Sequence, residues 1–281
     1  MPVTAFDRLA CPLDGQPLTR QLHAWQCPQG HSFDIARQGY VHLLPVQQKR
    51  SKDPGDSKAM VAARQRFLNA GYYQCIADAL NEAVLPEMAS GAACLDAGCG
   101  EGYYLRQLGQ AVPEGIDMQV IGLDVSKWAV LSAAKQDPAP SWVVGTNAHI
   151  PVPDSSLDRV LCVFGFPVYD EFARILGPAG RLVMVDPGPD HLRELRDIIY
   201  PSITERPAGA RAVPESFQVV NRETVCETIV LEDASSIEDL LAMTPHLYRA
   251  PAEGLARAAE LTRLQLTLDV RIQVLELTEQ T

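Results

Sequence analysis

A glycine-rich segment at residues 95–102 carries the residue types that indicate chemistry most directly. It reads Leu95-Asp96-Ala97-Gly98-Cys99-Gly100-Glu101-Gly102, so an apolar run ends in an acid and continues into three alternating glycines. Glycine suits a turn where the backbone approaches a ligand, because it has no Cβ in the way. A dinucleotide fingerprint has its third glycine one position later, where this chain has Tyr103.

A second acid follows another apolar run, Val120-Ile121-Gly122-Leu123, and is Asp124. A carboxylate at this place can accept hydrogen bonds from both hydroxyls of an adenosine ribose. The glycine turn and Asp124 together predict a site for an adenosine-containing cofactor. The alternative is a glycine-rich turn beside a solvent-facing aspartate.

A second constellation lies near the N-terminus, where Cys11 and Asp14 are followed by Cys27 and His31. Two pairs of donors in a turn-rich segment have the spacing of a zinc ribbon. Asp14 stands where a second cysteine is usual, and a carboxylate oxygen can also bind zinc. The sequence predicts one structural zinc on these four residues, and the alternative is a metal-free ribbon held by packing.

The charge is distributed unevenly along the 281 residues. The formal net charge is −11, but residues 1–70 carry +4 and the remainder carries −15. A polyanion such as RNA therefore has a candidate binding segment only near the N-terminus, above all at Lys49-Arg50-Ser51-Lys52. The alternative for this short run is a solvated linker.

Composition indicates an ordinary globular protein, with 47% hydrophobic and 21% charged residues. The seven cysteines are scattered and odd in number, which does not suggest a disulfide framework. No apolar run resembles a signal peptide or a membrane span. We therefore expect a cytoplasmic protein without membrane contact.

The order of predicted elements indicates an α/β fold with a mainly parallel sheet. We expect a helix that begins near Asp56 or Ser57 and ends near Gly71, a second helix over 73–88, and later helices near 190–200 and 236–243. The expected strands are 93–97, 119–124, 141–145, 158–164, 181–186, 216–220, 224–232 and 265–276. Three parts are predicted: a zinc-ribbon-like RNA-recognition part at 1–45, a basic linker with helices at 46–92, and a cofactor-binding domain at 93–281.

The glycine turn and Asp124 resemble the class I S-adenosylmethionine-dependent methyltransferase pattern. The resemblance implies a Rossmann-like sheet and places the glycine turn under the methionine part of the cofactor. It also implies that Asp124 binds the ribose and that the loop containing Asn147 lies against the adenine.

The two halves of the chain together resemble the bacterial 23S ribosomal RNA guanine-N1 methyltransferases. The resemblance spans most of the chain and includes the linker string Asp53-Pro54-Gly55-Asp56-Ser57, together with matches on both sides of it. These matches are Gly39-Tyr40-Val41, Lys49-Arg50-Ser51, Ala63-Arg64, Phe67-Leu68, Glu101-Gly102-Tyr103-Tyr104, Pro187-Gly188-Pro189 and Met243-Thr244-Pro245. Asp14 departs from the usual zinc cysteine.

The resemblance implies a function and a set of residues. It implies methyl transfer from S-adenosylmethionine to N1 of a guanine in a 23S rRNA hairpin loop, by a possible homodimer. It makes Cys11, Asp14, Cys27 and His31 the zinc ligands. It places Tyr73, Gly100, Glu101 and His191 against the cofactor, and a helix-packing pair is the alternative for Tyr73 and His191.

Methylation at guanine N1 requires loss of the N1 proton to a protein group or to water. The sequence leaves the catalytic base unidentified, because Asp170 and Glu171 are possible bases and could equally begin a solvent-facing helix. Phe164 and Phe166 could stack a base taken out of an RNA loop, although Phe164 could equally belong to the core. The alternative functions are methylation of a neighbouring rRNA guanine, as in the macrolide-resistance branch, a small-molecule methyltransferase, and a non-catalytic RNA-binding assembly factor.

Overall fold

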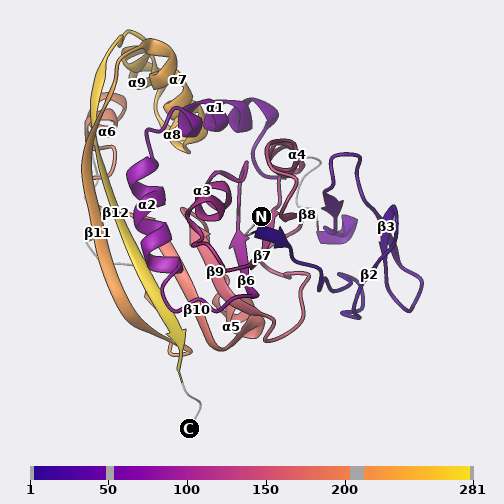
Figure 1. The fold of residues 1–281 in the computed structure, drawn as a ribbon. Helices are drawn as coiled ribbons and strands as arrows, with labels where there is room; N and C mark the ends of the chain where they lie inside the picture. Colours follow the sequence, from indigo (N-terminus) through magenta and orange to yellow (C-terminus); the bar gives the residue numbers. More distant parts are fainter. Residues whose placement is uncertain (1–2, 49–53, 203–211, 279–281) are drawn as a thin grey trace.

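The centre of the protein is a nine-stranded mixed sheet (Figure 1), seen in a computed structural model that describes residues 3–48, 54–202 and 212–278. The strand order is β11-β12-β10-β9-β6-β7-β8-β5, and β1 pairs with β7 outside this path. The strands are β1 (Val3–Ala5), β5 (Val41–His42), β6 (Ala92–Ala97), β7 (Met118–Asp124), β8 (Ser141–Val144), β9 (Leu157–Val163), β10 (Leu176–Pro187), β11 (Phe217–Leu231) and β12 (Leu264–Leu277). β12 runs antiparallel to both β10 and β11, and the other pairs are parallel. The expected Rossmann-like α/β sheet is confirmed.

Helices cover both faces of this sheet, which explains the nearly continuous apolar sequence of its central strands. All six residues of β6 are buried. One apolar cluster joins the sheet to α2 (Gln74–Val84), α3 (Tyr103–Ala111), α4 (Lys127–Gln136) and α6 (Arg193–Ile199). A second apolar cluster joins the sheet to α5 (Tyr169–Ile175) and includes residues near the N-terminus, such as Phe6 and Leu9. The glycine turn therefore lies at the end of a strand packed on both sides.

The expected strands agree with the structure to within a few residues, with two differences. β10 begins at Leu176, earlier than the expected residue 181, because Gly180 and its neighbours continue the extended backbone. β11 is one strand of 15 residues, whereas the sequence predicted two pieces. A register shift against β12 between Val219 and Asn221 falls at the end of the first predicted piece.

The N-terminal part contains its own small sheet of β2 (Thr19–Arg20), β3 (Ala24–Gln26) and β4 (Ser32–Asp34). Its apolar side chains do not form a separate core, since Phe6, Leu9 and Trp25 belong to the same cluster as Leu95 of β6. β1 and β5, which flank the small sheet, join the large sheet through β7 and β8. The short turn η1 (Val46–Gln48) follows. The division of the chain at residues 45 and 92 stays a prediction from the sequence.

Four helices gather at one end of the antiparallel pair β11–β12 (Figure 1): α1 (Lys58–Asn69), α7 (Ala234–Met243), α8 (His246–Arg249) and α9 (Ala252–Ala259). Ser57 caps α1 by accepting a hydrogen bond from Met60 N–H, and Gly71 follows the helix with φ +85°, as the sequence predicted. Arg66 Nε donates to Asp239 Oδ2 at 2.9 Å and so joins α1 to α7. Helices α8 and α9 were not predicted. Of the helices in the described ranges, none combines the length and hydropathy that a bilayer-crossing segment requires.

Candidate cofactor site and metal centre

The three alternating glycines form a left-handed turn between β6 and α3. Gly98, Gly100 and Gly102 have φ values of +99°, +55° and +82°, a region that side chains with a Cβ rarely adopt. A Cβ at Gly98 would meet nothing within 4 Å, which leaves space for a ligand against the backbone. A Cβ at Gly102 would lie 2.6 Å from the Trp142 ring. Gly98 therefore suits ligand approach, and Gly102 allows close packing on β8.

Asp124 ends β7 and closes the same turn from the neighbouring strand. Its Oδ2 accepts a hydrogen bond from Gly100 N–H at 3.0 Å, and its Oδ1 accepts one from Ser126 N–H at 2.7 Å. Burial raises the pKa of this carboxyl, and the two backbone N–H groups act in the opposite direction. Asp124 thus lies beside the glycine turn, and its contact with a cofactor ribose stays a prediction.

Side-chain oxygens of two residues next to the turn lack hydrogen-bond partners among the described residues. Asp96 is 1% exposed, and neither of its carboxylate oxygens has a hydrogen-bond partner in the described part of the chain. Burial, and then the charge of Asp124, raises the pKa of Asp96 to about 8. Asn147 donates to Ala97 O at 3.2 Å, but its Oδ1 is also unsatisfied. Since buried polar atoms are nearly always paired, these oxygens fit a ligand that supplies donors, such as the ammonium and adenine groups of S-adenosylmethionine.

Three aromatic side chains from distant segments meet near this turn. The ring of Phe164, which follows β9, stacks on His191 with centroids 5.7 Å apart and an interplanar angle of 28°. The Tyr73 ring lies 6.2 Å from Phe164 and 6.1 Å from His191. Phe164 is 36% exposed and Phe166 is 76% exposed. The structure thus brings together Tyr73 and His191, whose positions the resemblance implied, and adds Phe164.

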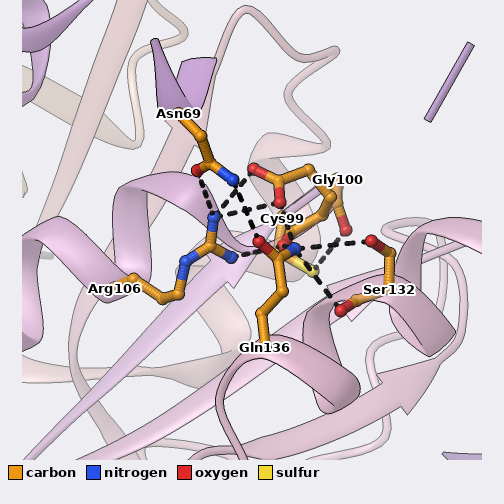
Figure 2. A network of polar contacts seen from close by, with 7 residues as sticks. Asn69, Cys99, Gly100, Arg106, Ser132 and Gln136 are labelled. Atoms are coloured by element: carbon orange, nitrogen blue, oxygen red, sulfur yellow. Dashed lines mark hydrogen bonds and ion pairs between the residues drawn. The ribbon is translucent and has the colours of Figure 1, made fainter. Parts of the chain in front are cut away.

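Glu101 has a different environment, because its carboxylate is buried in a polar network behind the turn. Figure 2 shows Asn69, Arg106 and Gln136 converging there from α1, α3 and α4. Arg106 Nη2 lies 3.0 Å from Glu101 Oε2, and Gln136 also donates to that oxygen. Arg106 Nη1 donates to the Glu101 carbonyl at 2.6 Å. The Glu101 carboxylate therefore fixes the turn to α3 and α4, and a contact between Glu101 and the cofactor stays a prediction.

The end of the linker packs on Val125 and Ser126, which follow Asp124 directly. A Cβ at Gly55, whose φ is +81°, would lie 2.9 Å from Ser126 Cβ and from Val125 Cγ1. Ser126 Oγ donates to the Asp56 carbonyl at 2.7 Å. The Asp56 carboxylate pairs with Arg64 of α1, whose guanidinium lies 3.5 Å from a Cβ placed on Gly100. The basic residues Lys49, Arg50 and Lys52 lie outside the described residues.

The two acids considered as possible bases differ in their surroundings. Glu171 accepts hydrogen bonds from Ile150 N–H at 2.8 Å and from Arg174 Nε at 2.9 Å. Burial favours the neutral form, but these hydrogen bonds hold the pKa of Glu171 below its ordinary value. Asp170 is exposed in the first turn of α5. Glu171 therefore stabilises the loop before β9 as an ionised partner of Arg174.

The four predicted metal ligands converge on one point. His31 Nδ1 lies 3.1 Å from Asp14 Oδ2, 3.3 Å from Cys27 Sγ and 3.5 Å from Cys11 Sγ. All four donor atoms lie within 4.8 Å of one another. Tetrahedral zinc with bonds of about 2.0–2.3 Å separates its ligands by roughly 3.3–3.8 Å, so the donor set fits zinc.

Local backbone structure explains this convergence. The Cys11 turn closes through Gly15 N–H to Cys11 O at 2.9 Å, and the Cys27 turn closes through Gly30 N–H to Cys27 O at 3.0 Å. Both glycines have positive φ. Asp14 Oδ1 accepts from Gln16 N–H at 3.0 Å, which leaves Oδ2 facing the other donors. Asp14 thus presents one oxygen to the other three donors, at the position where a thiolate is usual.

Some residues of the cofactor site were not singled out in the sequence. Tyr104 of α3 is buried, and its hydroxyl has no partner within the described residues. Gly55 and Arg64 were noted only as part of the family resemblance, and Asp56 was noted there and as a candidate start of the first helix. The signal for all four was the matching strings Asp53–Ser57, Ala63-Arg64 and Glu101–Tyr104, but no spacing in the sequence indicates that they meet.

The sheet order, the left-handed glycine turn and Asp124 at the end of β7 define a class I S-adenosylmethionine-dependent methyltransferase. A methyltransferase-domain family model matches residues 95–184, and the zinc-ribbon model described as RlmA, N-terminal, matches residues 9–52. The chain is 33% identical to the 23S rRNA (guanine(748)-N1)-methyltransferase of Streptomyces fradiae, over 95% of both chains. Relatives in Micromonospora griseorubida and Bacillus subtilis strain 168, named for 23S rRNA guanine-N1 methylation, are 33% and 31% identical over 94% and 88% of this chain, and over 95% and 88% of their own lengths. The chain belongs to the family of 23S rRNA (guanine-N1)-methyltransferases.

Proposed function

We propose that this protein methylates N1 of a guanine in a hairpin loop of 23S rRNA, with Asp96, Asp124 and Asn147 binding the cofactor. S-adenosylmethionine supplies the methyl group from its sulfonium. The observation that carries the proposal is the set of unsatisfied oxygens on Asp96 and Asn147 beside the open backbone of Gly98. Names of the relatives support 23S rRNA as the substrate.

Different residues of the site would position the cofactor and the guanine. Asp124 would accept from the ribose hydroxyls, since its carboxylate already faces the glycine turn. Asp96 would accept from the ammonium of the methionine part, because nothing else within the described residues satisfies its oxygens. Phe164, half-exposed and stacked on His191, would offer a ring against which a flipped guanine can stack. Such positioning supplies most of the catalysis in an in-line displacement.

The proposal assigns RNA contact to the ribbon and to the linker. Reversing Lys49, Arg50 and Lys52 to Glu should lower RNA affinity steeply and flatten its salt dependence, because fewer counterions are released on binding. Reversing Arg249, Arg257 and Arg263, which are exposed in the C-terminal half, gives a control with the same change of charge. Equal losses in both triple variants, or unchanged affinity in the first, would remove the linker from the RNA interface.

We also propose a homodimer. β11 lies at the edge of the sheet, and most of its 15 residues are exposed, so it offers unpaired backbone groups to another chain. Light scattering of the purified protein at micromolar concentration tests this, and a mass of one chain would reject it.

The experiment that tests the function is mass spectrometry of 23S rRNA from cells that lack this protein. The proposal predicts that 1-methylguanine disappears from one position and returns when the gene is restored. The same position should be methylated to a lower extent when the restored gene carries Asp124→Ala. An unchanged 1-methylguanine content would contradict the proposed substrate.

A further inference from the structure

Asp269 of β12 fixes the turn that carries His191. Its carbonyl accepts from Gly188 N–H at 2.7 Å, and its Oδ2 accepts from Asp190 N–H at 2.9 Å. A Cβ at Gly188 would lie 2.2 Å from the Asp269 carboxylate, so only glycine allows this approach. Asp269 is 7% exposed. The position of the imidazole therefore depends on the sheet, not on a loose loop.

The same residue determines which nitrogen of His191 carries a proton. The backbone N–H of Asp269 donates to His191 Nδ1 at 3.3 Å. A backbone N–H can only donate, so Nδ1 must be an acceptor without a proton. Neutral histidine then carries its proton on Nε2. His191 is therefore held as the Nε2–H tautomer and faces its next neighbour as a donor.

That neighbour is the hydroxyl of Tyr73. His191 Nε2 lies 3.5 Å from Tyr73 Oη, so the phenol oxygen is the acceptor of this contact. Tyr73 is 3% exposed, and burial raises its pKa well above the ordinary value, so the phenol keeps its own proton. Within the described residues, Tyr73 Oη has no hydrogen-bond partner other than His191. A buried phenol proton without an acceptor in the protein points to an acceptor on a ligand.

The surroundings locate that ligand. Phe164, in the segment after β9, stacks on His191 and lies 6.2 Å from the Tyr73 ring. Phe164 has φ +51° although it is not glycine, and its N–H donates to Val185 O at 2.8 Å. Gly165 lies 3.6 Å, measured from its ideal Cβ, from the carbonyl of Ala97 just before the glycine turn. The segment Phe164-Gly165 therefore lies between the Tyr73 ring and the residue that precedes the cofactor turn.

We propose that Asp269 N–H, His191 and Tyr73 form a one-way chain of hydrogen-bond donors that ends in the Tyr73 hydroxyl. In this series of hydrogen bonds, the Tyr73 O–H donates to an oxygen of a bound reactant. That oxygen is either in the methionine carboxylate of the cofactor or is O6 of guanine, where negative charge develops when N1 loses its proton. His191 then cannot be the base for N1, since Nδ1 is occupied and Nε2 already carries a proton. This assignment rests on the proposed function, because it names the role of two residues in that site.

The tautomer can be tested without methylation. Long-range ¹H–¹⁵N correlation spectra of the ¹⁵N-labelled protein separate the two neutral tautomers and the imidazolium, and the signal missing from His191→Gln identifies His191. The expected result is an Nε2–H imidazole at about pH 7.5. An Nδ1–H tautomer or an imidazolium at that pH would overturn the proposed chain of hydrogen bonds. This outcome is independent of whether the RNA substrate is correctly proposed.

Substitutions of Tyr73 and His191 test the direction of these hydrogen bonds in the active protein. Tyr73→Phe removes the last donor and should reduce kcat/KM by about tenfold to a hundredfold, as loss of a hydrogen bond to a charged oxygen does. An increased Kd for S-adenosylmethionine in calorimetry would identify the carboxylate as acceptor, and a lower kcat with unchanged Kd would identify O6. Tyr73→Phe with unchanged kcat and Kd would overturn the proposal.

His191→Gln keeps an N–H donor on a side chain that cannot take a proton. It should cost about tenfold or less in rate and leave the acid limb of the pH–rate profile in place. His191→Ala, which removes the donor, should cost more. Loss of about a thousandfold or more in His191→Gln together with loss of the acid limb would identify His191 as the base and overturn the chain.

Discussion

The carboxylate of Asp124 holds the backbone of Gly100, with Oδ2 accepting from Gly100 N–H at 3.0 Å. One acid at the end of β7 therefore shapes the glycine turn and faces the place proposed for the ribose. We predict that Asp124→Ala weakens S-adenosylmethionine binding by about 1.5–3 kcal/mol, because charge-assisted hydrogen bonds are lost. Asp124→Asn, which keeps one acceptor oxygen, should lose less. Calorimetry measures both, and unchanged affinity in Asp124→Ala would remove Asp124 from the site.

The contact of Gly55 with Ser126 predicts an effect of the linker on stability. Gly55→Ala places a Cβ 2.9 Å from Ser126 Cβ at a φ of +81°, so strain and a clash should together cost about 2–3 kcal/mol of unfolding free energy. Gly71→Ala is the matched control, because φ is +85° and a Cβ there meets nothing within 4 Å. It should cost about 1 kcal/mol. Denaturant unfolding measures the free energy of unfolding of both variants. Equal losses of stability would show that the close approach to Ser126 does not contribute to the effect.

The buried Asp96 predicts a pH dependence of stability in the free protein. Its pKa is raised from 3.8 to about 8, so between these values the native state holds a proton that the unfolded chain has released. This contribution is fully present below about pH 4 and is lost as pH rises through 8. Relative to Asp96→Asn, the wild type should lose at most about 1.4 kcal/mol per pH unit in that window.

The control for this prediction is Asp117→Asn, because Asp117 is exposed. That variant should follow the wild type at every pH. Unfolding curves measured at intervals from pH 5 to pH 8 decide the matter. If the wild type and Asp96→Asn run parallel across this range, Asp96 is already ionised in the native protein.

The zinc centre predicts a measurable difference between Asp14 and a thiolate. Protein purified without chelators should contain about one zinc per chain. Asp14→Cys should raise zinc affinity in competition with a chromophoric chelator, and Asp14→Ala should lower it, because one of the four donors changes or disappears. Less than about a tenth of an equivalent of zinc in a ribbon that still resists proteolysis would contradict a structural zinc site.

Local sequence patterns predicted the parts of the site that come from one segment. The glycine turn begins at the end of β6, and Asp124 ends the adjacent parallel strand β7, so they meet at the same edge of the sheet. The zinc ligands were predicted because two short turns each supply a pair. Tyr73, Phe164 and His191 come from three distant segments, and only tertiary packing places their rings 5.7–6.2 Å apart. Family resemblance indicated Tyr73 and His191, but it could not supply the hydrogen bond from Asp269.

The strands β1 and β5 and the direction of the Glu101 side chain could not be predicted, because both depend on contacts with distant segments. β1 and β5 have three and two residues, which is too short for a periodic pattern. β1 pairs with the part of β7 that β8 leaves uncovered, and β5 pairs with β8 at the end of the strand order. Glu101 lies within the glycine turn, but its side chain points to Arg106 and Gln136 instead of outward. The direction of the Glu101 side chain depends on Gln136 of α4, and no pattern within the turn indicates this contact.

Methylation of purified, unmodified 23S rRNA tests the central claim most directly. The protein, S-adenosylmethionine and the RNA are incubated together, and nuclease digests are analysed by mass spectrometry for the identity and position of the methylated base. We predict 1-methylguanine at a single position approaching one per RNA, and none with Asp124→Ala at limiting cofactor. A folded, zinc-loaded protein that binds S-adenosylmethionine but forms no 1-methylguanine, or that methylates a different atom, would contradict the account.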